Sequence, residues 1–264
     1  MSCGTDLDRF RLSPALRPPA PLATNVAPVP QSAEARMYTL CWSPKGGSGT
    51  TVVAAALAIV ASRNGPTMLV DLGGDSAAAL GTVIPEGPGV GEWLATSAAP
   101  ADRLWQLAHQ CGPDLQLIHP GVLPTGPEFT ELAAERLAAA AAAASQHVII
   151  DAGPRHPADV LHRCAERSLL VIRPCYLALR RAVAIGPDAS GVIVVTEPGR
   201  CLSKLDIERA LGLDVVAELP WDPGVARAVD AGLLLARLPA SIARPLERMS
   251  SRHHPAAAHA ALQQ

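Results

Sequence analysis

A glycine-rich segment, SPKGGSGTT (Ser43–Thr51), has residue types and spacing suited to holding a phosphate group. It follows an apolar run that predicts a strand and leads directly into a run that predicts a helix. In such a strand–loop–helix unit, backbone N–H groups converge on a phosphate, and the positive end of the helix dipole adds to the attraction. The residues expected to supply these groups are Gly46, Gly47, Ser48 and Gly49. The alternative is a tight turn that holds no ligand.

One position of this loop differs from the usual phosphate-loop motif. That motif continues with a Lys that reaches the β- and γ-phosphates, followed by a Ser or Thr whose hydroxyl ligates Mg²⁺. Thr50 occupies the Lys slot and Thr51 the hydroxyl slot, and the nearest lysine is Lys45, at the front of the loop. A charge-assisted hydrogen bond contributes roughly 1.5–3 kcal/mol. Its loss predicts a nucleotide affinity weaker by about ten- to hundredfold.

Two aspartates end predicted strands, at the edge where open α/β sheets bind their ligands. Asp71 ends the run Thr67–Asp71, and Asp151 ends the run His147–Asp151. Carboxylate oxygens suit Mg²⁺, so we expect Asp151 to hold the hydration shell of the ion, with Asp71 as a second acid near the metal. The alternative for each is an ordinary aspartate that caps a turn at the end of a strand.

Short apolar runs alternate with helical segments through most of the chain. Strands are predicted at Tyr38–Ser43, Thr67–Asp71, Leu115–His119, His147–Asp151, Ser168–Arg173, Gly191–Thr196 and Asp214–Glu218. Helices are predicted near Thr50–Asn64, Phe129–Ser145, Leu177–Ile185, Ser203–Leu211 and Pro223–Ala231. Continuous apolar strands alternating with helices predict an α/β fold with a doubly wound, mostly parallel sheet flanked by helices.

Length and composition fit one large domain with flexible ends. The chain has 264 residues, of which 49% are hydrophobic and 17% charged, so it can build a sizeable core. Residues 1–35 are rich in proline and predict a disordered leader, residues 36–249 the domain, and residues 250–264 a flexible tail. The segment Ser241–Arg252 has apolar and basic residues at helical spacing, interrupted by Pro245. We expect a helix that closes the domain rather than one that binds a membrane.

Charge limits the partners that the whole surface can attract. The net charge is −2 and the pI about 6.4, so contact with nucleic acid would need a local basic patch. Arg180 and Arg181, on a predicted helix, form a candidate for binding DNA phosphates without base specificity; an ordinary solvated face is the alternative. Six scattered cysteines, no secretion signal and no apolar run of membrane-spanning length predict a cytoplasmic protein without a transmembrane segment.

Four segments together resemble the ParA/MinD family of positioning and partitioning ATPases. KGGSGTT is similar to the deviant Walker A motif KGGxGKT, and TMLVDLGGD (Thr67–Asp75) to the second motif of the family. HVIIDAGP (His147–Pro154) resembles the Walker B strand, and LPWDPGVARAVDAG (Leu219–Gly232) the segment beside the adenine. The resemblance implies ATP or ADP with Mg²⁺ as cofactor, Pro220 and Asp222 near the base, and a homodimer in which Lys45 reaches the partner's phosphates.

The departures from the family pattern concern hydrolysis. Gly73 replaces the second aspartate of the second motif, which in the family orients the attacking water, and Asp75 is the nearest acid that could substitute. Lys45 and Asp75 are therefore the candidate catalytic residues. With Thr50 and Gly73 both altered, we expect very slow or absent ATP turnover.

The missing loop lysine makes the sequence look most like the CpaE/TadZ pilus-assembly proteins and related septum-site regulators. The leading hypothesis is a nucleotide-dependent positioning protein that recruits pilus, secretion or division machinery. Two alternatives stay open: a non-catalytic scaffold without nucleotide, and a chromosome or plasmid partitioning ATPase that binds DNA.

Overall fold

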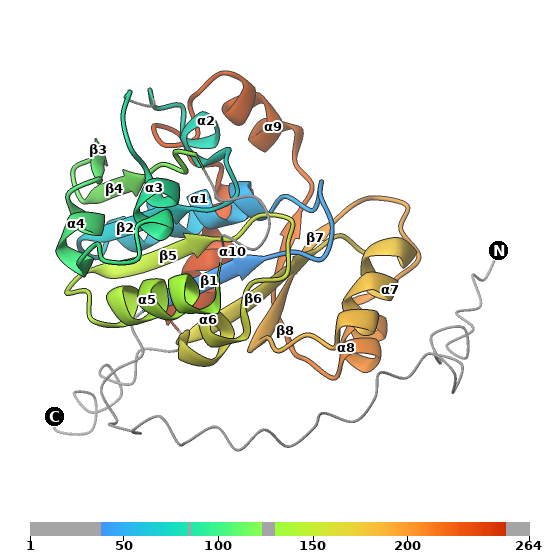
Figure 1. Ribbon diagram of the computed structural model, residues 1–264. Coiled ribbons are helices and arrows are strands. Elements are labelled where there is room, and N and C mark those ends of the chain that lie inside the picture. Colours follow the sequence, from blue (N-terminus) through green and yellow to red (C-terminus); the bar gives the residue numbers. More distant parts are fainter. Residues whose placement is uncertain (1–37, 84–85, 123–129, 252–264) are drawn as a thin grey trace, which may run out of the picture.

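The computed structural model describes residues 38–83, 86–122 and 130–251 (Figure 1). Within them, eight strands form one sheet in the order β3-β4-β2-β5-β1-β6-β7-β8, in which every neighbouring pair is parallel except β3 and β4. The strands are β1 (Tyr38–Trp42), β2 (Thr67–Asp71), β3 (His109–Gly112), β4 (Leu115–Ile118), β5 (His147–Asp151), β6 (Arg167–Ile172), β7 (Gly191–Thr196) and β8 (Val215–Pro220). The predicted fold class, a doubly wound and mostly parallel sheet, is confirmed.

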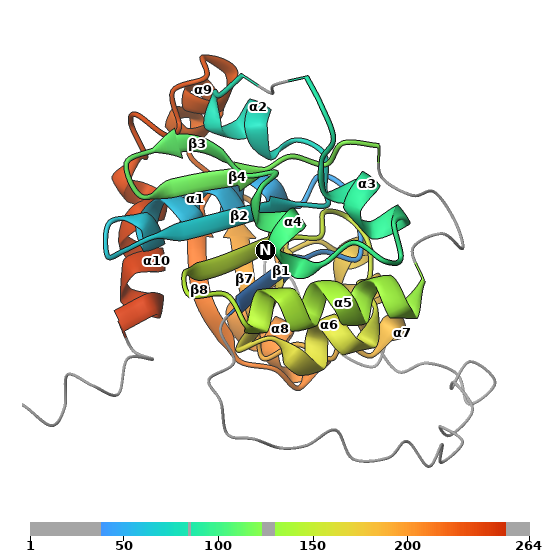
Figure 2. The same ribbon diagram turned by 60° about the vertical axis from the view of Figure 1, so that its left-hand side comes forward.

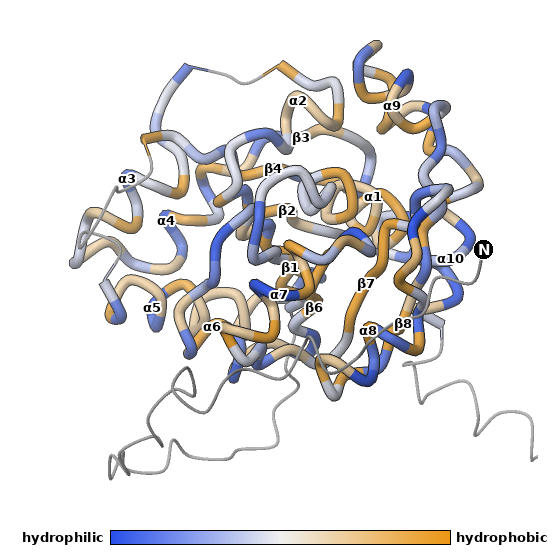
Figure 3. Tube along the Cα trace, turned by 90° about the vertical axis from the view of Figure 1, so that its right-hand side faces the viewer, coloured by the Kyte–Doolittle hydropathy of each residue, from blue (hydrophilic) through white to orange (hydrophobic). Residues whose placement is uncertain are grey.

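Helices cover both faces of this sheet. They are α1 (Thr50–Ser62), α2 (Ser76–Leu80), α3 (Val90–Ala95), α4 (Ala101–Trp105), α5 (Glu131–Ala142), α6 (Asp159–Cys164), α7 (Tyr176–Ile185), α8 (Lys204–Leu211), α9 (Pro223–Asp230) and α10 (Ala240–Ser251). Figures 1 and 2 show α5 and α6 on one side of the sheet and α1 on the other. The strands are mostly hydrophobic, and hydrophilic residues lie mainly on the outside (Figure 3).

The alternation of side chains along the strands divides the core into two clusters. Tyr38, Leu40 and Trp42 of β1 pack with the helices on the side of α5 and α6, while Cys41 packs with α1 and α10. All five residues of β1 and of β2 are buried, as expected for strands covered on both faces. Helix α1 is apolar around most of its circumference and is correspondingly buried along most of its length.

The seven predicted strands are all present, with boundaries within two residues of the prediction. The sequence interpretation missed β3, whose residues His-Gln-Cys-Gly lack an apolar pattern and which pairs antiparallel with β4 at the edge of the sheet. It also missed the short helices α2, α3, α4 and α6. These have five or six residues each, too few for a helical period to show.

The predicted closing helix is present as α10. It runs through Pro245, buries Ile242, Leu246 and Met249, and packs against α1 and β8. In the described part of the chain, no helix is long and apolar enough to cross a membrane. Three predicted features lie outside the described residues: the leader, most of the tail, and the start at Phe129 of the helix observed as α5.

Candidate functional site

The candidate site lies where the strand order reverses. Strand β1 pairs with β5 on one side and β6 on the other, so the loops after these strands open at the same edge of the sheet. Ligands of open α/β sheets bind in the crevice outside the carboxyl ends of the strands at such a switch point. The glycine-rich loop follows the central strand β1 and ends at the N-terminus of α1.

The loop is held in shape by its serines. The hydroxyls of Ser43 and Ser48 are 2.8 Å apart, and each lies 3.0 Å from the carbonyl oxygen of Lys45. Gly47 and Gly49 adopt φ angles of 77° and 89°, a left-handed conformation that favours glycine. No hydrogen bond within the described residues engages the N–H groups of these two glycines. The loop thus presents free amide donors at the start of a 13-residue helix, which fits a phosphate.

The cationic contribution of the loop is small. Lys45 is half-buried, and its Nζ donates to the carbonyl oxygen of the adjacent Gly46 at 2.9 Å. Thr50 is buried as the first residue of α1. Thr51 is half-buried, and its hydroxyl is near enough to the carboxylate of Asp151 to lower the pKa of that group. The loop therefore has the amides and the hydroxyl of a phosphate site, but no lysine at the helix start.

Asp71 and Asp151 lie side by side at the ends of β2 and β5, and both are fully buried. Burial raises the pKa of Asp151 to about 6, and the negative charge of Asp71 adds to the rise while the Thr51 hydroxyl opposes it. Burial also raises the pKa of Asp71, against the effect of three backbone N–H bonds. Two neighbouring buried carboxylates favour a bound cation, and the oxygen donors of Thr51 and Asp151 suit Mg²⁺.

The two aspartates differ in what their oxygens do. Asp71 accepts N–H groups from Gly73 at 2.9 Å, Gly74 at 2.7 Å and Ser76 at 2.9 Å, so its carboxylate holds the turn that leads into α2. Asp151 accepts from Gly153 N–H at 2.9 Å and from Ser76 Oγ at 3.3 Å. Asp71 thus shapes the loop, and Asp151 remains the better placed of the two for a metal.

Gly73 is packed against the loop that follows β5. A Cβ atom at this position would lie 2.9 Å from Oδ2 of Asp151 and 3.3 Å from Cα of Gly153. An aspartate at position 73 would therefore require the Asp151 carboxylate and the loop after β5 to shift. Asp75, the predicted substitute, is exposed at the N-cap of α2, and its side chain makes no capping hydrogen bond.

The segment predicted to lie beside a base starts where β8 ends. Pro220 is exposed, and the carboxylate of Asp222 caps α9 by accepting Gly224 N–H and Ser241 Oγ, each at 2.6 Å. These bonds hold the pKa of Asp222 below its usual value. The role of Asp222 in the structure is thus to anchor α9 and α10.

A shallow cavity of about 590 Å³ lies next to this segment. It is lined by Arg173, Glu197, Pro198, Gly199, Arg200 and Trp221. The sequence interpretation did not single out these residues. The available signal was that Arg173, Glu197 and Trp221 each directly follow a strand of the same parallel sheet.

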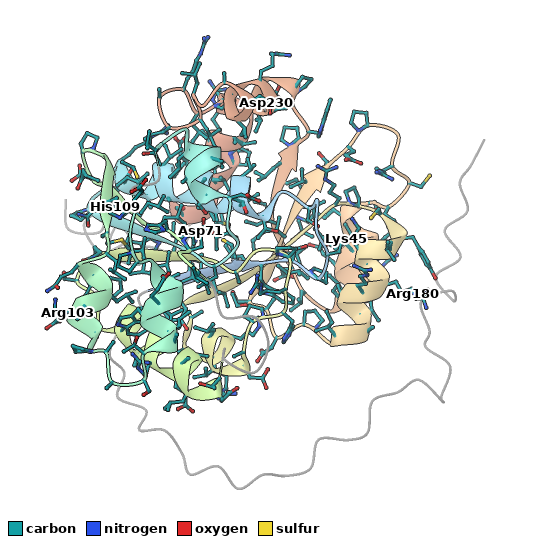
Figure 4. The ribbon with its side chains drawn as sticks, turned by 45° about the horizontal axis from the view of Figure 1, so that its top comes forward. Lys45, Asp71, Arg103, His109, Arg180 and Asp230 are labelled. Atoms are coloured by element: carbon teal, nitrogen blue, oxygen red, sulfur yellow. The ribbon has the colours of Figure 1, made fainter. Side chains whose placement is uncertain are left out.

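Arg180 and Arg181, the candidate DNA contacts, are both exposed on α7. Figure 4 shows Arg180 on the same side of the molecule as Lys45, with His109 and Arg103 on the other side. Contact of these arginines with DNA stays a prediction.

A cluster of aromatic rings packs around the end of β1, where the loop begins. The Trp42 ring meets those of His156 and His162 edge-on at centroid distances of 5.0 Å and 5.1 Å. Ser168 Oγ accepts from Trp42 Nε1 at 3.2 Å and lies 2.8 Å from Nδ1 of His162. Burial, together with the charge of His156, lowers the pKa of His162 to about 4.

This lowered pKa predicts an acid sensitivity that resides at His162. The fold favours the neutral imidazole, so the contribution of His162 to stability is present above about pH 6.5 and is lost as the pH falls toward 4. As the pH falls from about 6.5 toward 4, the wild type should therefore lose stability relative to His162→Asn, by on the order of 1 kcal/mol per pH unit. Urea unfolding at three pH values between neutral and the lowered pKa measures it; a constant difference would contradict the prediction.

Structural comparison identifies proteins with the same arrangement. The ParA family ATPase from Chlorobium tepidum TLS superposes with a TM-score of 0.66 at 18% identity, over 83% of this chain and 98% of that one. The chain has the fold of the ParA- and MinD-type ATPases. MinD from Pyrococcus horikoshii OT3, in complex with Mg-ADP, gives a TM-score of 0.64 at 17% identity over 84% and 98% of the two chains.

A variant of McdA from Cyanothece in complex with ATP is also similar, with a TM-score of 0.60 at 18% identity over 82% and 96% of the two chains. The sequence matches no model of a known protein family and no curated protein sequence. At these identities the similarity to the ParA- and MinD-type ATPases is one of fold. The CpaE/TadZ branch expected from the sequence is a finer assignment than the structural similarity reaches.

Proposed function

We propose that this protein binds ATP or ADP with Mg²⁺ at the glycine-rich loop and acts as a cytoplasmic, homodimeric positioning protein. Its cargo is protein machinery such as that of pilus assembly, secretion or division. The observation that carries the proposal is the set of free amides of Gly47 and Gly49 at the start of α1, beside the Thr51–Asp151 pair. The solved structures with Mg-ADP and with ATP have this fold, which supports the same ligand here.

In this site, Gly46 to Gly49 would hold the phosphates, and Thr51 and Asp151 the Mg²⁺. Mg²⁺ would neutralise phosphate charge and draw Asp151 toward its ionised form. Lys45 would leave the carbonyl oxygen of Gly46 and reach the phosphates of a partner subunit.

We expect the purified protein to bind Mg-ATP weakly and to hydrolyse it very slowly or not at all. Thr50 supplies no charge for the transferred phosphoryl group, and Gly73 supplies no acid that orients water. Calorimetric titration of ATP with Mg²⁺, followed by single-turnover hydrolysis of the bound nucleotide, measures both steps. Turnover that Asp75→Ala abolishes would contradict the expectation and make Asp75 the catalytic acid.

The second candidate is a scaffold that uses the fold without nucleotide. The observation that favours it is that Thr50 and Gly73 leave the site without a lysine at the helix start and without an acid at the second position after β2. Titrations of ATP and ADP with Mg²⁺ that both give no heat and no thermal stabilisation would favour the scaffold.

A further inference from the structure

Arg173 stands between the glycine-rich loop and the cavity near β8. It directly follows β6, whose Ile172 pairs with Val194 of β7, so Arg173 is placed beside Val195. The Cγ2 atom of Val195 lies 3.8 Å from where a Cβ of Gly49 would be. Arg173 and Val195 are thus the next residues after the last paired residues of β6 and β7, and Val195 borders the phosphate loop. On its other side it lines the cavity together with Trp221.

The charges in this cavity are unequal. The carboxylate of Glu197 binds two guanidinium groups: Oε1 accepts from Nη1 of Arg173 at 2.6 Å, and Oε2 accepts from Nε of Arg200 at 2.6 Å. One carboxylate shared by two arginines leaves an excess of one positive charge. If Arg173 turned to another anion, Glu197 would still bind Arg200, so its carboxylate would keep a positively charged partner.

Arg173 also has unused donor capacity. Its Nε is buried and has no hydrogen-bond partner among the described residues. A guanidinium group can bind a phosphate through two parallel N–H bonds, and a buried donor without a partner is unfavourable until such an acceptor arrives. The side chain is about one third exposed, so a ligand in the cavity can reach it.

We propose that Arg173 supplies the phosphate-binding cation that Thr50 does not. The inference rests on the proposed function, nucleotide binding at the glycine-rich loop, and adds a residue that neither the loop motif nor the strand-end acids indicate. In this arrangement Arg173 releases Glu197 to Arg200 when the nucleotide enters and binds its phosphates from the side of β6. The exposed indole of Trp221 lies beyond it, on the side of β8.

The test compares a ligand with phosphates and one without. Mg-ATP and adenosine are titrated into the wild type, Arg173→Gln and Arg163→Gln, the last being a matched loss of an exposed arginine on α6. We expect Arg173→Gln to weaken ATP binding about tenfold and to leave adenosine binding unchanged, and Arg163→Gln to change neither. In a Thr50→Lys background, the loss of ATP affinity caused by Arg173→Gln should fall below about threefold, since the introduced lysine would then bind the phosphates.

The outcomes separate this inference from the function on which it rests. Equal ATP affinity in the wild type and Arg173→Gln overturns the role of Arg173 and leaves nucleotide binding intact. A wild type that binds neither ATP nor ADP overturns the proposed function and the inference together. If Arg173→Gln fails to fold in a thermal melt, Arg173→Met decides, because methionine keeps a long unbranched side chain and removes the charge. Weaker ATP binding with unchanged adenosine binding then supports the role, and wild-type ATP affinity overturns it.

Discussion

Thr50→Lys is expected to tighten Mg-ATP binding about ten- to hundredfold. Thr50 is the first residue of α1, directly after Gly49, and occupies the slot from which a lysine side chain reaches the β- and γ-phosphates. The added charge-assisted hydrogen bond contributes roughly 1.5–3 kcal/mol. Calorimetric titration of Mg-ATP into both proteins measures the change.

Thr50→Met is the matched control, because methionine extends the side chain without adding a charge. It should leave the dissociation constant for ATP within about threefold of the wild type, since it adds no charge-assisted bond. An equal affinity gain in both variants would show that side-chain length, not charge, limits binding. No gain in Thr50→Lys would mean that position 50 does not face the phosphates.

Gly81→Ala is expected to destabilise the fold by about 3 kcal/mol. Gly81 follows α2 with a φ of 76°, and a Cβ there would overlap the backbone carbonyl group of Gly232, after α9. The left-handed conformation costs alanine about 1–2 kcal/mol, and overpacking of a tight contact adds about 1–3 kcal/mol. The free energy of unfolding, from urea denaturation of both proteins, measures the loss.

Gly212 provides a matched control for this substitution. It follows α8 with a φ of 66°, but a Cβ there would meet no atom within 4 Å. Gly212→Ala should therefore cost only the conformational part, about 1 kcal/mol. If the two alanine variants lose the same stability, the contact between Gly81 and Gly232 does not hold α2 and α9 together.

The sheet could be predicted from the sequence because buried parallel strands are continuous apolar runs with clear ends. The glycine-rich loop could be predicted because its chemistry lies in one contiguous segment. Edge strand β3 could not, because half-exposed polar residues carry no such pattern.

The remainder of the site depends on contacts between distant segments. Arg173, Glu197 and Trp221 are far apart in the chain, and only the parallel pairing of β6, β7 and β8 brings them to one cavity. The different roles of Asp71 and Asp151 likewise depend on which backbone N–H groups reach each carboxylate. In the sequence alone, both residues are aspartates at the end of a predicted strand, and nothing distinguishes their roles.

The close approach of Gly73 and Gly153 limits the order in which this site can change over generations. A Cβ at Gly153 would lie 2.8 Å from Cα of Gly73, and a Cβ at Gly73 would meet Asp151. A single mutation that introduces an acid at position 73 would therefore have to displace the Asp151 carboxylate and the backbone of Gly153. On the proposed function, an acid at position 73 would therefore need a second change that separates the loops after β2 and β5.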